Sequence, residues 1–210
     1  MNLAIKKDIT RQDLIKVIGQ YFPNGKGVEV GSFKAEFAKE IMELWSGTLY
    51  MVDVWSALDK NDYLDSSNHG NFKNGEIYGS AIDNISGYEN RAIMIRANSE
   101  IASDIFTDES LDFVYIDANH AYEYVVQDIN LWYPKVKSGG YLCGHDYISM
   151  NWSEDPNFME NGKDKHIYSG NGFYHGFFGV NPAVDEFCLK NGYEAIVTKE
   201  WFGSWKIKKK

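Results

Sequence analysis

Two apolar segments of this chain end in polar side chains that could carry out chemistry. The segment VYI is followed by Asp117, Asn119 and His120, and the segment YLC is followed by His145 and Asp146. A carboxylate can hold a divalent cation, and an imidazole, with a reference pKa of ~6.5, can take a proton from a hydroxyl group near neutral pH. We therefore predict that the ends of these two segments form one reaction site.

A glycine and an acid at two other segment ends predict a second feature, a ribose-binding site. Gly31 follows the segment VEV, and Asp53 ends the segment TLYMVD. Each has an ordinary explanation alone, as a turn glycine or as a helix-capping acid. Together, ~20 residues apart, they favour an adenosine-type ligand. The glycine lets the protein backbone approach such a ligand closely, and the acid binds the hydroxyls of its ribose. Because no G-x-G-x-x-G run follows Gly31 and no G-x-x-x-x-G-K-[ST] loop occurs, a ribose ligand without a phosphate fits better.

These side chains need a scaffold, and the spacing of apolar residues predicts one. Short apolar runs alternate with segments of helical periodicity, which is typical of βαβ units and of a mostly parallel sheet covered on both faces. The expected strands cover residues 27–32, 48–55, 91–98, 111–118 and 139–147, and the expected helices cover 9–22, 34–45, about 76–87, 99–106, 122–136 and 181–192. Residues 193–200 and 201–209 are expected to form a terminal hairpin with Gly203 in its turn.

The fold class that follows is α/β, a doubly wound sheet in one domain over residues 1–210. An N-terminal helical segment covers residues 1–26, residues 56–75 form a surface loop, and Ser99 is the expected N-cap of the helix over 99–106. Ligands bind such sheets outside the carboxyl ends of the strands. The polar residues described above all lie at those ends.

Composition narrows the function classes. The chain has 210 residues and a net charge of −9, so it is a poor binder of nucleic acid, whose affinity rests on Lys and Arg contacts to phosphates. It contains no run of ~18 apolar residues, and its start lacks the apolar core of a signal peptide, so we expect no membrane association and a cytoplasmic location. Cys143 is expected to be a buried free thiol, and with Cys188 it makes too few cysteines for a disulfide framework.

Two stretches resemble a known family. GVEVGSFKAEFAKEI, from residue 27, resembles the first motif of class I S-adenosylmethionine-dependent methyltransferases. Residues 112–147 (DFVYIDANHAYEYVVQDINLWYPKVKSGGYLCGHDY) are similar to small-molecule O-methyltransferases related to macrocin O-methyltransferase and, more distantly, to catechol-type enzymes. The resemblance implies a Rossmann-like sheet of seven strands and methyl transfer from S-adenosylmethionine to a hydroxyl of a small molecule.

The resemblance also implies which residues hold the cofactor. Asp53 would bind the ribose, and Asn98 or Ser99 would lie beside adenine. The residues implied to contact the cofactor are Glu29, Gly31, Ser32, Phe33, Asp53, Asn98, Ser99 and Asp117.

The resemblance also implies a metal site and a general base, but this chain departs from the family pattern at both. Relatives often hold a divalent cation at the positions of Asp117, His145 and Asp146; Asp117 and Asp146 could bind Mg²⁺, but an imidazole at position 145 is a poor ligand for it. His120 stands at the spacing of the lysine base of catechol-type enzymes, whereas macrocin-type enzymes place an acid where this chain has Asn119. We therefore predict His120 as the base, with His145 as second candidate. The alternative for His120 is a capping or packing role.

Residues 147–180 are predicted to be a lid over the site. Five of its aromatic residues suit a planar or sugar-like acceptor: Trp152, Phe158, Tyr168, Phe173 and Tyr174. Alternatively, these side chains pack only against their own loop. A nicotinamide-dependent oxidoreductase, a non-catalytic methyltransferase-fold protein, an N- or C-methylating enzyme and assembly into a homo-oligomer stay open.

Overall fold

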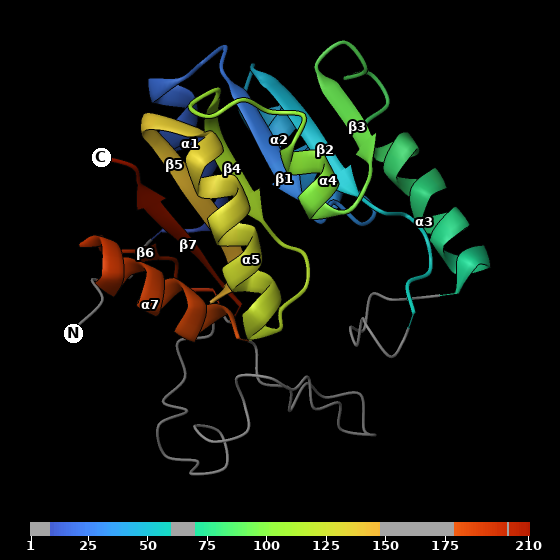
Figure 1. Cartoon of the computed structure of the whole chain (residues 1–210). Coiled ribbons are helices and arrows are strands. Elements are labelled where there is room, and N and C mark those ends of the chain that lie inside the picture. Colours follow the sequence, from blue (N-terminus) through green and yellow to red (C-terminus); the bar gives the residue numbers. More distant parts are fainter. Residues whose placement is uncertain (1–8, 60–69, 148–178, 201) are drawn as a thin grey trace.

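A computed structural model describes residues 9–59, 70–147, 179–200 and 202–210 of the chain (Figure 1). The strands are β1 (Lys26–Val30), β2 (Thr48–Asp53), β3 (Ala92–Arg96), β4 (Leu111–Ile116), β5 (Val136–Tyr147), β6 (Ile196–Val197) and β7 (Gly203–Lys208). The helices are α1 (Arg11–Tyr21), α2 (Glu36–Leu44), α3 (Asn71–Asn84), α4 (Ser99–Ser103), α5 (Tyr122–Trp132), the 3₁₀ turn η1 (Tyr133–Lys135) and α7 (Val180–Asn191).

The strands form one seven-stranded sheet in the order β3-β2-β1-β4-β5-β7-β6. The pairs among β1 to β5 are parallel, and β7 pairs antiparallel with both β5 and β6. The strand order reverses between β1 and β4, where a doubly wound sheet opens a crevice for a ligand. The predicted fold class is confirmed.

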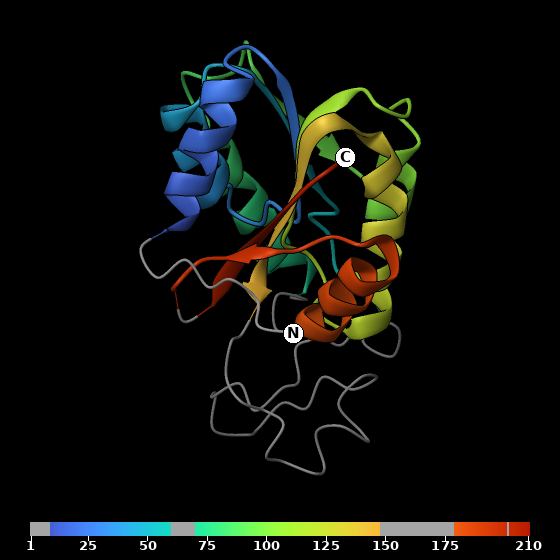
Figure 2. The ribbon, with the colours of Figure 1, turned by 90° about the vertical axis from the view of Figure 1, so that its left-hand side faces the viewer.

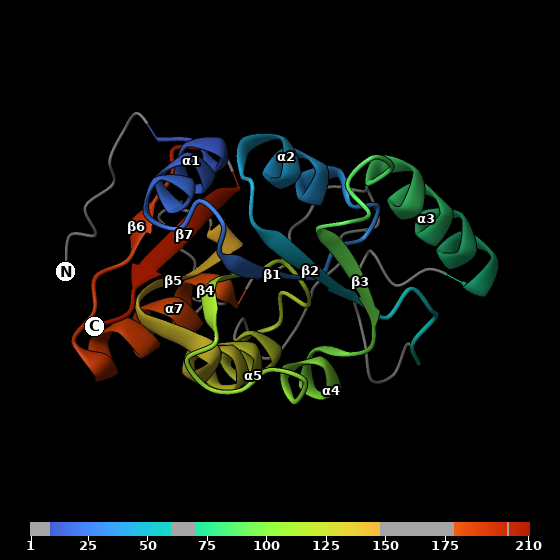
Figure 3. The same ribbon diagram turned by 90° about the horizontal axis from the view of Figure 1, so that it is seen from above.

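Helices cover both faces of the sheet (Figures 2 and 3). In Figure 3, α1, α2 and α3 lie on one side of the strands, and α4, α5 and α7 lie on the other. The central strand β4 is buried along its whole length. Its alternate residues supply both cores: Phe113 and Tyr115 pack with α1–α3, whereas Val114 and Ile116 pack with α5 and α7.

Several predicted boundaries need correction. The helix expected at about 76–87 is α3, which begins earlier, at Asn71. Its N-cap is Gly70, whose backbone is extended. The N-cap of α4 is Asn98, whose Oδ1 accepts a hydrogen bond of 2.9 Å from the Ile101 amide, and Ser99 is the first helical residue. Gly203 is the first residue of β7 and pairs with Tyr147, so it does not lie in the hairpin turn.

Three further sequence predictions concern the cysteines, membrane-spanning helices and the lid. Cys143 and Cys188 are both buried and free, as expected for Cys143. Within the described parts of the chain, no helix has the length and apolarity to cross a membrane. The predicted lid, with its five aromatic residues, lies outside the described residues except at its two ends.

Candidate active site

A cavity of about 600 Å³ opens at the carboxyl ends of β1, β2, β3 and β4. Residues of α3 and α5 complete its walls. The predicted site residues that line it are Gly31, Phe33, Asp53, Asn98, Ser99, Asp117 and His120. Its volume is in the range of small-molecule sites in proteins.

Gly31 allows the ends of β1 and β4 to meet below the cavity. Its φ is +90°, and its amide donates a hydrogen bond of 2.8 Å to the carbonyl of Val52. A Cβ atom at this position would overlap the carbonyl group of Asp117. Glycine is therefore required both by the backbone conformation and by the close approach of a neighbouring strand end.

Asp53 joins two strained loop positions at the cavity wall. Its Oδ2 accepts the Phe33 amide at 2.8 Å, and its Oδ1 accepts the Trp55 amide at 2.9 Å. Phe33 and Trp55 have φ values of 46° and 42°, and the Trp55 indole donates to the Phe33 carbonyl at 2.7 Å. Burial raises the pKa of Asp53, and the backbone amides oppose this. Each carboxylate oxygen keeps a second acceptor site for a ligand hydroxyl.

Glu29 and Ser32 are buried residues that do not line the cavity. Burial raises the pKa of Glu29 to about 8; Ser32 opposes the shift, and the charges of Asp117 and Asp53 add to it. Burial therefore favours the neutral form of the Glu29 carboxyl group. Direct contact of these two residues with a cofactor stays a prediction.

Ser99 lies on the cavity wall and is held by two residues of α5. Its hydroxyl donates a short hydrogen bond to Asp128 Oδ1 and accepts one of 2.8 Å from the indole nitrogen of Trp132. Burial raises the pKa of Asp128 to about 7, which the Ser99 hydrogen bond opposes. Our sequence reasoning missed Asp128, although it occupies a core position of α5 beside Val125 and Ile129. An acid at a core position of an amphipathic helix was the available signal.

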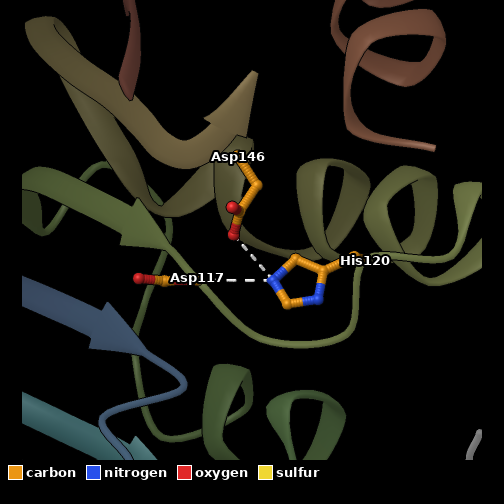
Figure 4. Close-up of side chains that lie close together, drawn as sticks. All are labelled: Asp117, His120 and Asp146. Carbon is orange, nitrogen blue, oxygen red and sulfur yellow. Dashed lines mark ion pairs between the residues drawn. The ribbon is translucent and has the colours of Figure 1, made fainter. Parts of the chain in front are cut away.

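The two predicted polar segment ends meet in a cluster of Asp117, His120, His145 and Asp146. His120 Nε2 lies 2.8 Å from Asp146 Oδ2 and 3.8 Å from Asp117 Oδ1. Figure 4 shows the side chains of Asp117, His120 and Asp146 pointing toward one another from β4, β5 and the loop before α5. His145 Nδ1 lies 3.4 Å from the same Asp146 oxygen. The predicted base and both predicted metal ligands therefore share one location.

The alternative role of His120 as a helix cap is not observed. The N-cap of α5 is Ala121, and the Asn119 side chain accepts a hydrogen bond of 2.9 Å from the Ala121 amide. Asn119 thus shapes the turn before α5, where the macrocin-type pattern has an acid. The turn directs the His120 ring toward Asp146.

The charges of the cluster favour an ionised Asp146. Burial would raise the pKa of Asp146, but hydrogen bonds from His120 and His145 outweigh it and hold this pKa well below its usual range. Burial opposes protonation of His145, yet the carboxylates of Asp146 and Asp117 raise its pKa. An imidazole next to these carboxylates is stabilised when it takes up a proton.

The cluster also has the donor atoms of a cation site. Asp117, His120 and Asp146 each offer one ligand atom, and these three atoms lie within 4.8 Å of one another. Two carboxylates suit Mg²⁺, whereas an imidazole is a ligand for Zn²⁺ or Fe²⁺. This donor set fits a divalent cation, and it fits a transition metal better than Mg²⁺.

A family model described as a methyltransferase domain matches residues 27–147, more than half of the chain and all of the strand ends described above. The chain belongs to this methyltransferase family. The match confirms the family resemblance seen in the sequence and favours methyl transfer over the nicotinamide-dependent alternative. A short match links this methyltransferase to the uncharacterized protein R132 of Acanthamoeba polyphaga mimivirus, with 42% identity over 43 residues, which are 20% of each chain.

Solved structures share the fold of this methyltransferase. A protein assigned as a caffeoyl-CoA O-methyltransferase from Staphylococcus aureus matches with a TM-score of 0.63 at 15% identity, over 94% of this chain and 82% of that chain. A protein assigned as an O-methyltransferase from Klebsiella pneumoniae gives a TM-score of 0.60 at 12% identity, with coverage of 97% and 82%. Cofactor-bound Rv0187 from MTB gives 0.58 at 13% identity, with coverage of 99% and 83%.

Proposed function

We propose that this methyltransferase transfers the methyl group of S-adenosylmethionine to a hydroxyl group of a small molecule. The observation that carries the proposal is one cavity that has Gly31 and Asp53 on its walls together with Asp117 and His120. The first pair suits a ribose-containing cofactor, and the second pair suits activation of a hydroxyl group. Proteins assigned as O-methyltransferases among the structures of the same fold support the choice of a hydroxyl acceptor.

In the proposed reaction the acceptor oxygen attacks the methyl carbon of the sulfonium. The carbon–sulfur bond breaks, its electron pair stays on sulfur, and S-adenosylhomocysteine leaves. The hydroxyl proton passes to the His120 imidazole, and the ionised Asp146, 2.8 Å away, stabilises the imidazolium. Holding the two reactants in line supplies much of the rate in such a displacement.

A cation-assisted version of this reaction is favoured by the convergence of Asp117, His120 and Asp146. A divalent cation held by these residues would lower the pKa of the acceptor hydroxyl. His120 would then be a ligand, because a nitrogen that binds a cation cannot also accept the proton. Activity that survives removal of metals by a chelator assigns His120 as the base, and activity that returns on addition of Zn²⁺, Fe²⁺ or Mg²⁺ assigns it as a ligand.

Calorimetric titration with S-adenosylmethionine and S-adenosylhomocysteine tests the proposal. We expect micromolar binding to the wild-type protein and about a hundredfold weaker binding to Asp53→Ala, because two charge-assisted hydrogen bonds to ribose are lost. Asp83→Ala, which removes an exposed acid on α3, is the matched control and should bind normally. Absence of binding to the wild-type protein would contradict the proposal.

Methyl transfer to a panel of sugars and phenols then tests the chemistry. We expect His120→Ala to bind S-adenosylhomocysteine as the wild type does and to lose about 10²- to 10⁴-fold in turnover. Cofactor binding by the wild type without transfer to any acceptor would support the non-catalytic alternative instead.

A further inference from the structure

The strand ends arrange the polar groups of the cavity in a line. Ser99 follows β3, Asp53 ends β2, Gly31 follows β1 and Asp117 follows β4, and these strands are neighbours in the order β3-β2-β1-β4. With a ribose at Asp53 and the reacting methyl group near Asp117, the base of the nucleoside lies beyond Asp53, toward Ser99. Asp128 lines the cavity and is hydrogen-bonded to Ser99, and the proposed methyl transfer gives it no role.

The hydrogen bonds around Ser99 determine which oxygen of Asp128 can bind a ligand. The Trp132 indole nitrogen is solely a donor, so Ser99 Oγ accepts its hydrogen at 2.8 Å. An ionised Asp128 is solely an acceptor, so the Ser99 hydroxyl donates its own hydrogen to Asp128 Oδ1. The second carboxyl oxygen of Asp128 belongs to a side chain on the cavity wall and can receive a hydrogen bond from a ligand.

We infer that Asp128 selects adenine as the base of the cofactor by accepting a hydrogen bond from its 6-amino group. This inference rests on the proposed function, because it requires an adenosine cofactor in the cavity. A base with a 6-oxo group in place of the amine would set its oxygen against the carboxylate oxygen. Asp128 is then a specificity-determining residue.

A buried carboxyl suits this task. Asp128 is 5% exposed, and the contact with an amine would replace the water contacts that burial removes. Since burial raises its pKa to about 7, the carboxyl is mostly ionised at pH 8 and is then solely an acceptor. A site that hydrogen-bonds one substrate group rejects analogues that leave its buried group unpaired.

Titration at pH 8 with S-adenosylhomocysteine and S-inosylhomocysteine, which differ at the 6-position of the purine, tests the inference. We expect the wild type to bind the adenosine compound at least about tenfold more tightly. Asp128→Asn should lower this preference or reverse it. The Ser99 hydroxyl needs an acceptor, so it holds the amide oxygen of the new side chain and turns the NH₂ group toward the base, where it favours the 6-oxo group.

Asp104→Asn is the matched control, since it removes the same charge from an exposed side chain. Asp104 is the C-cap of α4, at the opposite end of that helix from Ser99. It should keep the wild-type preference. Circular dichroism checks that each variant is folded.

The outcomes separate this inference from the proposed function. A wild-type protein that binds neither compound overturns both. A wild type that binds both compounds equally, or a folded Asp128→Asn variant with an unchanged preference, overturns the role of Asp128 and leaves the proposed function standing. The comparison of the two compounds on the wild type tests the role of Asp128 even if the variant does not fold.

Discussion

Ser99 is the residue on which two buried polar side chains of α5 depend. Its hydroxyl satisfies Asp128 and the indole nitrogen of Trp132, whose side chain is fully buried. A buried polar group that loses its partner costs about 1–3 kcal/mol, more than the bond itself contributes. We therefore expect Ser99→Ala to lower the free energy of unfolding by about 2 kcal/mol in urea denaturation.

Ser80→Ala is the control for this prediction. Like Ser99→Ala, it deletes a serine hydroxyl that donates a hydrogen bond. The acceptor is the backbone carbonyl of Glu76 at 3.0 Å, and this bond on α3 is exposed. Its effect should stay within about 0.5 kcal/mol. Equal effects of the two substitutions would show that the hydrogen bonds of Ser99 contribute no more to the free energy of unfolding than an exposed bond does.

At the scale of elements, the site depends on how closely the ends of β1 and β4 approach. Gly31 combines a φ of +90° with contact to the Asp117 carbonyl, so an alanine there must both adopt an unfavourable φ and push the two strand ends apart. We expect Gly31→Ala to destabilise the fold by about 2–4 kcal/mol and to abolish cofactor binding, measured by urea denaturation and calorimetry.

Gly87 offers a matched control for the conformational part of this cost. Its φ is +91°, and nothing lies within 4 Å of a Cβ added there. Gly87→Ala should cost about 1 kcal/mol and leave binding unchanged. A Gly31 variant no less stable than the Gly87 variant would mean that the β1–β4 contact is not tight in solution.

At the scale of the whole molecule, the sequence predicts the sheet and the ends of its strands well. Alternation of short apolar runs with amphipathic helices is enough for a doubly wound order, and that order brings Asp117 and Asp146 to one edge. The start of α3 is not predictable in this way, because its first turn contains a single apolar residue, Phe72, and therefore shows no apolar periodicity. The pairing of His120 with Asp146 depends on the turn made by Asn119, and the link from Ser99 to Asp128 joins residues 29 positions apart, so both require three-dimensional packing.

The net stability of the molecule should also respond to pH in an unusual direction. The pKa of Asp128 is about 7 in the folded protein against an ordinary value of 3.8, so the folded state binds more protons than the unfolded state between these values. Stability from this group is therefore full below about pH 4, falls as the pH rises to about 7, and is constant above. Between pH 5 and pH 8 the loss amounts to roughly 3 kcal/mol.

Urea denaturation of the wild type and of Asp128→Asn across this range measures the effect. Asparagine does not titrate, so the stability of the variant relative to the wild type should rise by roughly 3 kcal/mol from pH 5 to pH 8. Glu29, whose pKa of about 8 acts in the same direction, is present in both proteins and cancels in the difference. Parallel stability curves for the two proteins would show that Asp128 is ionised in the folded state throughout, with water or a cation compensating its charge.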